Sequence, residues 1–438
     1  MFKSEITRFN QNMDTIRGYI DSVEPVLLEK ISENLKKDAE DLSALILLFN
    51  EPIFNDEECS IDISDEIKEK VKQKFGGDIV VEPADNELGC TLNVIGPGGK
   101  RFTRAISKFY KLENQKILLY RSSLMSIVST VECFFLDLLQ VYFKEYPFEI
   151  TPALISKKDK HFTLEEIEAF SDIKDARAFL IDDKLENLLR GSFDSWIDFL
   201  KEKLNLGLGY IDDEKENLIE IFQRRNIVVH NKGIVNSIYL SKVSERYKKV
   251  AKKGHPIYID RKYLDDIINK LELCFSLIAF EIWKKKDKDD EARYSFLSDL
   301  ISTNLDLHRW EIVRGYSIFL ANDACSSNWY KTFARINMWL SIKKLGSFEK
   351  IKDSVQKEDF SACTTDFQAC KCALLEDFDN VYKLSNQVLE SGMYTFDFMM
   401  SWPIFDDFKK SDKFNELKAK FVVEGQDHQK DQEKIADA

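Results

Sequence analysis

Apolar residues recur every three or four positions along most of the chain, and this spacing is typical of amphipathic helices. The longest such segment spans residues 116–143, and a second spans residues 260–284. Each carries an apolar face that needs partners in a helical bundle. The face of the first is formed by Leu124, Ile127, Val128, Val131, Phe134, Phe135, Leu138 and Tyr142. Further helices are predicted within residues 5–50, as a pair, and at residues 164–190, 193–205 and 213–231.

Residues 76–104 break the helical pattern. Residues 79–81 and 91–95 are rich in β-branched and apolar side chains, and Gly96-Pro97-Gly98-Gly99 is typical of a turn. We therefore predict a small β-hairpin near the N-terminus. Gly98-Gly99-Lys100 is also compatible with a phosphate-binding loop, but Arg101 stands where a magnesium-binding Ser or Thr is needed. A plain turn is the preferred interpretation.

The last third of the chain is predicted to form helical hairpins after a charged linker at residues 284–290. The segment at residues 401–417 resembles the end of a tetratricopeptide-like array, with a non-repetitive helical domain as the alternative. Arrays of this kind present concave surfaces, so a protein partner or inhibitor is expected there. Four parts are predicted: an N-terminal helical region with the hairpin (1–115), a helical bundle (116–285), a C-terminal helical repeat-like domain (291–425) and a disordered tail (426–438).

Composition agrees with a soluble helical protein. The 438 residues include few Gly (16) and Pro (8), and the net charge is −13. No uninterrupted apolar run approaches the ~20 residues of a membrane span, and the first residues lack the blocks of a secretory signal. The eight cysteines are scattered, as expected for buried, reduced thiols in a cytosol. We therefore expect a cytoplasmic protein that does not bind a membrane.

Candidate chemistry is concentrated at residues 224–231. On a helix, Arg225 falls within an apolar stripe, whereas Arg224 points the opposite way. An Arg in such a stripe needs a carboxylate, a phosphate or a subunit seam, because its charge is permanent. Asn226 and His230 lie together at one edge of the stripe, so they and Arg225 can meet one ligand. The stripe consists of Leu218, Ile221, Phe222, Val228 and Val229.

The sequence Arg225-Asn226, His230-Asn231, Gly233, Val235-Asn236 and Tyr239-Leu240 resembles the motif helix of the HEPN superfamily and the segment after it. Many members of this superfamily are metal-independent endoribonucleases with an Arg-x4-6-His signature. Together with the helices before it, the resemblance covers residues 116–285. It implies a microbial toxin or an antiviral defence effector that is held inactive until a partner or signal acts.

This resemblance and the residue chemistry assign roles. His230 is expected to act as general base or acid, because imidazole exchanges protons near neutral pH. Arg225 would hold the scissile phosphate, and Asn226 completes the catalytic set. Glu132 is a candidate supporting residue that pairs with Arg225 or orients His230; a solvated or capping role is the alternative.

A basic segment follows the motif. Residues 221–262 contain eleven basic and two acidic side chains, a net charge of +9. Such a segment can hold RNA phosphates, although it can also be a solvated loop. The residues expected to bind RNA are Arg246, Lys248, Lys249, Lys252 and Lys253.

The sequence thus predicts a mainly α protein, with a HEPN-like helical bundle, a helical hairpin array and a small N-terminal β-hairpin. The predicted activity is metal-independent cleavage of RNA at a homodimer seam formed by Arg225 and His230. No metal or cofactor is expected, since the five histidines form no paired metal motif. The alternative is a non-catalytic HEPN-like dimeric scaffold, or an RNA-binding protein whose C-terminal array binds a protein partner.

Overall fold

The computed structural model describes residues 2–37, 65–83, 90–150, 154 and 163–421. The protein is mainly α, with 77% helix in 19 helices and one two-stranded antiparallel hairpin within the described chain. The predicted fold class is therefore confirmed. The chain divides into two compact units, one of residues 1–6 and 269–438 and the other of residues 7–268. The predicted tail at residues 426–438 lies outside the described residues.

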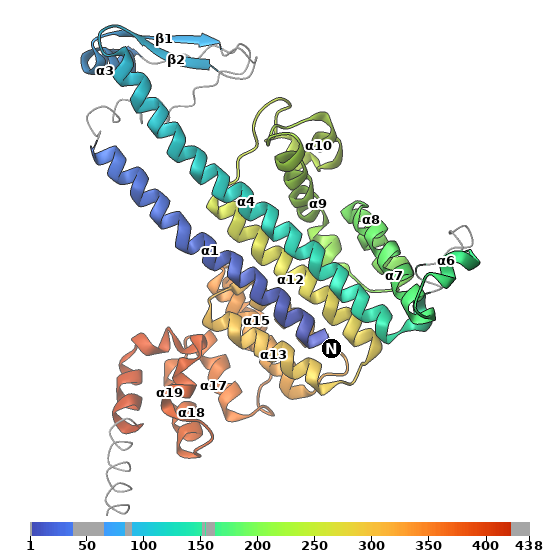
Figure 1. Ribbon diagram of the computed structural model, residues 1–438. Helices are drawn as coiled ribbons and strands as arrows, with labels where there is room; N and C mark the ends of the chain where they lie inside the picture. The colour runs from blue at the N-terminus through green and yellow to red at the C-terminus, as the bar shows by residue number, and fades with distance from the viewer. Residues whose placement is uncertain (1, 38–64, 84–89, 151–153, 155–162, 422–438) are drawn as a thin grey trace, which may run out of the picture. The chain divides into compact units, whose positions relative to one another are not determined.

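The N-terminal segment is one 36-residue helix, α1 (Phe2–Lys37), which continues through Pro25. The second helix predicted before residue 50 falls on residues outside the described ranges. Helix α1 runs antiparallel to α4 (Gly99–Glu145) (Figure 1). Phe9 of α1 stacks on Phe134 of α4 at 4.2 Å, and Glu24 accepts a hydrogen bond from Tyr120.

The hairpin consists of β1 (Asp78–Pro83) and β2 (Cys90–Ile95), paired from Asp78 with Ile95 to Pro83 with Cys90. Helix α3 (Asp65–Phe75) precedes it. The strands agree with the prediction, and the predicted turn at residues 96–99 leads from β2 into α4. A Cβ atom on Gly98 would lie 2.0 Å from the carbonyl oxygen of Phe75, so glycine is needed for close backbone approach.

Helix α4 has 47 residues and begins 17 residues before the predicted start at 116. Its first turns carry many polar residues, so the apolar spacing revealed only the second half. All eight residues of the predicted apolar face are buried, which confirms that face. The part from Asn114 to Glu145 is long and apolar enough to cross a membrane, and 44% of its most apolar window is buried. That evidence is weak, because a core helix of a soluble protein passes the same test.

The next helices pack against α4 and against one another. The predicted helix at 164–190 is divided into α6 (Leu164–Glu168), which has the predicted Thr163–Glu166 capping box, and α7 (Ile173–Leu189), which is capped by Asp172. Ser192 caps α8 (Phe193–Asp198), and a π-helical turn (Phe199–Lys203) continues it. Trp196 of α8 stacks on Phe135 of α4 at 4.9 Å. The segment then turns into α9 (Gly209–His230).

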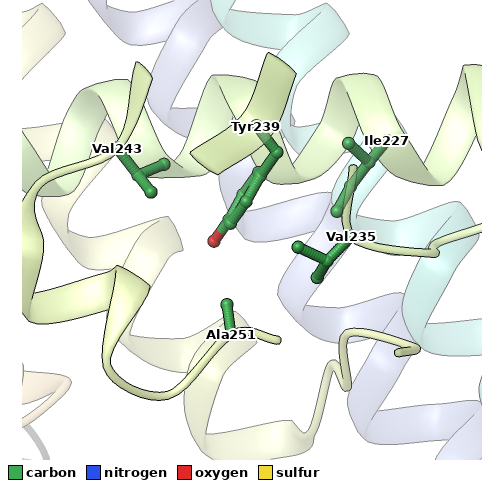
Figure 2. Packing of buried hydrophobic residues seen from close by; sticks show 5 residues of the cluster. All are labelled: Ile227, Val235, Tyr239, Val243 and Ala251. Atoms are coloured by element: carbon green, nitrogen blue, oxygen red, sulfur yellow. The ribbon is translucent and has the colours of Figure 1, made fainter. Parts of the chain in front are cut away.

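Three further helices follow: α10 (Ser237–Lys242), α11 (Glu245–Lys248) and α12 (Arg261–Lys286). The segment of residues 235–251, which includes α10 and α11, folds back onto α9 and buries Ile227 of α9 against four apolar side chains (Figure 2). Those are Val235, Tyr239, Val243 and Ala251. Helix α12 extends through the first three residues of the predicted linker.

The C-terminal part of the chain consists of helical hairpins. Its longer helices are α13 (Glu291–Asp306), α14 (Trp310–Ala321), α15 (Asn328–Lys344), α17 (Thr365–Leu374) and α18 (Phe378–Glu390). Its short helices are α16 (Lys352–Lys357), α19 (Phe396–Ser401) and the 3-10 turns Phe348–Lys350, Pro403–Phe405 and Phe408–Lys410. Another 3-10 turn, Pro147–Glu149, follows α4. A buried ion pair at 2.5 Å joins Arg293 of α13 to Asp323, which follows α14.

Cysteine burial agrees only in part with the prediction. Among the described cysteines, Cys274 and Cys370 are buried, whereas Cys133 and Cys325 are exposed. Cys133 is exposed because it lies outside the apolar face of α4, next to Glu132.

Candidate functional site

Helix α9 ends where the motif ends. The backbone N–H groups of Asn231 and Gly233 both donate to the carbonyl oxygen of Ile227 at 2.9 Å, which closes the last turn. Lys232 and Gly233 have φ values of +56° and +79°, so the chain reverses direction directly after His230. The motif side chains therefore lie at a helix end that is fixed by backbone hydrogen bonds.

Arg225 forms an ion pair with Glu132 of α4. The two side chains keep 22% and 29% of their exposure, so the pair is partly open to solvent. Arg225 Nε is buried and has no hydrogen-bond partner. Burial raises the pKa of Glu132, and the charge of Arg225 opposes that rise. Of the two alternatives for Glu132, the structure thus places it beside Arg225 and not in a solvated or capping position.

His230 is more accessible than Arg225 is. Asn226 is half-buried and His230 is exposed, and neither side chain has a hydrogen bond or ion pair to any described residue. His230 follows Arg225 by five residues, about 7.5 Å along the helix axis. Val229, at the end of the predicted apolar stripe, is 45% exposed. The other four members of the stripe are buried, and both α4 and α8 pack against α9.

A second arginine, which sequence reasoning missed, lies at the same helix end. Arg121 of α4 rests against Gly233: a Cβ atom on Gly233 would lie 2.6 Å from Arg121 Nη2. The guanidinium of Arg121 has no carboxylate or hydrogen-bond partner among the described residues. Since α4 and α9 run antiparallel, Glu132 meets Arg225 and Arg121 meets Gly233. This pairing depends on tertiary structure, and no local sequence signal could have identified Arg121.

Arg224 points to a different side of α9 from Arg225, and its side chain keeps only 12% of its exposure. Its Nε donates to Glu220 at 2.6 Å, its Nη1 donates to the carbonyl oxygen of Tyr258 at 2.8 Å, and its guanidinium lies 4.0 Å from the ring centre of Tyr263. The hydroxyls of Tyr239 and Tyr263 donate to Glu220 at 2.8 and 3.0 Å. Burial, followed by the Glu220 charge, raises the pKa of both phenols. The Glu220–Arg224 spacing of i,i+4 was the available sequence signal for this cluster.

The basic segment is tied to the end of α9. Val235 N donates to His255 O at 2.9 Å, and Ile257 N donates to Gly233 O at 2.8 Å. A cavity of about 350 Å³ lies beside this junction, lined by residues that include Arg224 and Lys252. Four of the predicted RNA-binding residues are exposed, namely Arg246, Lys249, Lys252 and Lys253. The fifth, Lys248, is half-buried and pairs with Glu245 at 2.7 Å.

In the described part of the chain, no group of three or more His, Cys, Asp or Glu side chains is arranged to hold a metal ion. Comparison with models of protein families, with curated proteins and with solved structures finds no match for this chain. The HEPN-like interpretation therefore rests on the motif residues and on their surroundings in the fold.

Proposed function

We propose that the protein is a metal-independent endoribonuclease whose site is the C-terminal end of α9. The observation that carries the proposal is the contrast within the motif: Glu132 holds Arg225 in place, while the exposed imidazole of His230 has no partner among the described residues. Arg121 adds a positive charge at the same end of α9, and its guanidinium has no partner among the described residues. Cleavage of a phosphodiester bond requires this combination, in which cations bind the phosphate and another group transfers protons.

The chemistry follows from these groups. His230 removes the proton from a ribose 2′-hydroxyl, whose oxygen attacks the adjacent phosphorus, and the bond to the 5′-oxygen of the next nucleotide breaks. Arg225 and Arg121 stabilise the negative charge that develops on the phosphoryl oxygens. The products carry 2′,3′-cyclic phosphate and 5′-hydroxyl ends. Without a metal-activated water, the neighbouring hydroxyl is the available nucleophile.

A homodimer would supply the second proton-transfer group. One imidazole cannot both remove the first proton and already carry the proton that the leaving group takes, whereas a two-fold axis brings a second His230. The exposed Val229 beside Arg225 supports this arrangement, because an apolar side chain at the site can pack against a partner. The seam would be similar to the dimeric sites that the HEPN resemblance implies. A role as a microbial toxin or defence effector is proposed on the same basis.

The deciding experiment incubates purified full-length protein with total RNA in excess chelator, followed by end-group mass spectrometry. Wild-type protein should cleave RNA, and His230→Ala should be about 10²–10⁴-fold slower. His255→Ala is the matched control, since it removes an exposed imidazole on the neighbouring loop. Cleavage that requires metal and leaves 5′-phosphates would contradict the mechanism.

A non-catalytic scaffold is the second candidate. It is favoured by the Arg225–Glu132 pair, which can also serve only to join α9 to α4. The scaffold is supported if the wild-type protein is a dimer that leaves RNA uncleaved and the Val229→Glu variant is a monomer. A dimer that cleaves RNA, and loses cleavage when Val229→Glu separates it, would support the enzyme.

A further inference from the structure

A cavity of about 360 Å³ lies among α13, α15, α17, α19 and the turn that follows α19. Its volume is within the range of small-ligand pockets, about 300–1,000 Å³. All of its lining residues belong to the C-terminal part of the chain, so it is distinct from the end of α9. The cavity is therefore large enough for a small ligand and has to be considered separately from the end of α9.

Aromatic rings form much of the wall. Trp329 stacks on Phe333 at 5.4 Å with an interplanar angle of 6°, and Phe333 in turn stacks on Trp402 at 6.2 Å. Tyr394 and Phe398 form another pair at 5.3 Å. The indole of Trp402 is fixed by a 3.2 Å hydrogen bond from its Nε1 to Asn337. Held ring faces of this kind attract cations through their negative quadrupoles.

The polar groups of the cavity are acidic. Asp366 is only 6% exposed, and its Oδ1 is buried without a hydrogen-bond partner. Its Oδ2 accepts one long hydrogen bond, 3.3 Å, from the hydroxyl of Tyr394. Asp299 and Asp306 are exposed lining residues, and no Lys, Arg or His lines the cavity. A buried carboxylate with an open lone pair is costly unless a donor reaches it.

Two further groups near Asp366 are neutral and do not offset its negative charge. Cys370 lines the cavity as a neutral thiol, because burial and then the Asp366 charge raise its pKa. The same two causes raise the pKa of Tyr394, so its hydroxyl remains a neutral donor. Asp366 also lies in the first turn of α17, where the helix dipole favours a negative charge.

We propose that this cavity binds an organic cation of the alkylammonium or guanidinium type. The orphaned Oδ1 of Asp366 accepts a hydrogen bond from the cation, and the aromatic rings of the wall add cation–π attraction. Anions are excluded by the three carboxylates, and a neutral ligand would leave the charge of Asp366 uncompensated. The cation can be a free amine or a Lys or Arg side chain, which present the same chemistry. This site functions independently of any activity at α9.

The test is calorimetric titration of the full-length protein with butylguanidinium and butylammonium, against butylurea as the neutral isostere. Both cations should bind, and butylurea should bind at least about tenfold more weakly, as expected for loss of one charge-assisted contact. Titration with Gly-Gly-Arg-Gly-Gly distinguishes the sources: binding as tight as that of butylguanidinium assigns the site to a protein side chain, and much weaker binding assigns it to a free amine.

Variants separate binding from folding. Asp366→Asn should weaken cation binding by about 10- to 100-fold without lowering the melting temperature, because it removes a buried charge that lacks a partner. Trp329→Leu is a second variant at a half-exposed position, and it should also weaken binding. Asp353→Asn, an exposed carboxylate on α16 outside the cavity, is the matched control. Equal binding of butylurea and the cations, or undiminished binding by Asp366→Asn, would overturn the proposal.

Discussion

Arg224 and Arg225 leave α9 on different sides and meet different surroundings. Arg224 lies in a closed cluster: a carboxylate, a backbone carbonyl and an aromatic ring contact its guanidinium, and two tyrosine hydroxyls contact Glu220 in turn. Arg225 has Glu132 as its ion-pair partner, keeps a buried Nε without a hydrogen bond, and stands next to Asn226 and near His230 at the open end of the helix.

The difference separates a structural cation from a functional one. A guanidinium whose donors are taken by protein groups holds elements together, and a phosphate would have to displace those partners. A guanidinium that is oriented by one carboxylate and is still partly exposed to solvent can bind a phosphate with little rearrangement. The two residues have the same chemistry, so the surroundings decide their roles.

The largest expected effect is on RNA cleavage. Arg225→Ala should slow cleavage by about 10²–10³, because it removes one group that stabilises the developing charge. Arg224→Lys keeps a positive charge beside Glu220 and should leave the rate per folded molecule within about threefold, since Arg224 is given no part in the reaction. Rates are measured on a defined single-stranded RNA, with the folded fraction taken from circular dichroism. Equal losses of cleavage rate in Arg225→Ala and Arg224→Lys would contradict the proposed difference between the two arginines.

The effects on stability should be reversed, with the larger loss expected at the Arg224 cluster. Glu220→Ala leaves Arg224 buried without its carboxylate and should lower the free energy of unfolding by about 3–5 kcal/mol. Glu132→Ala affects a pair that is partly exposed, so about 1 kcal/mol is expected. Urea unfolding followed by tryptophan fluorescence measures both. A larger loss for Glu132→Ala would show that the Arg225 pair is mainly structural.

The raised pKa of Glu132 gives a pH-dependent version of this test. A carboxyl whose pKa is higher in the folded than in the unfolded state favours folding below the unfolded value, 4.5, and loses that contribution as the pH rises through the folded value. Glu132→Gln removes this titration. The wild-type protein should therefore lose stability relative to Glu132→Gln as the pH rises above 4.5. A difference that is constant from pH 4 to 8 in urea unfolding would contradict the burial of Glu132.

Much of the helical framework could be predicted because apolar periodicity is a local property. The apolar face of α4 and the buried part of the α9 stripe could be predicted from side-chain spacing alone. Asn226 and His230 were placed at the edge of the stripe in the same way. The early start of α4 was missed because polar first turns give no apolar signal. Arg121 was missed because its position beside Gly233 arises from the antiparallel packing of two helices distant in sequence.

The smallest expected effect concerns the basic segment, where the same comparison recurs between adjacent lysines. Lys248 is already paired with Glu245, whereas Lys249 is exposed and has no partner among the described residues. If Lys249 contacts an RNA phosphate, Lys249→Ala should reduce the slope of log affinity against log salt by about 0.7, the value per contact for single strands. Lys248→Ala should change it less, because Glu245 competes for that charge. Fluorescence anisotropy with a labelled RNA and the His230→Ala background measures binding without cleavage, and equal slopes in all three proteins would identify this segment as a solvated loop.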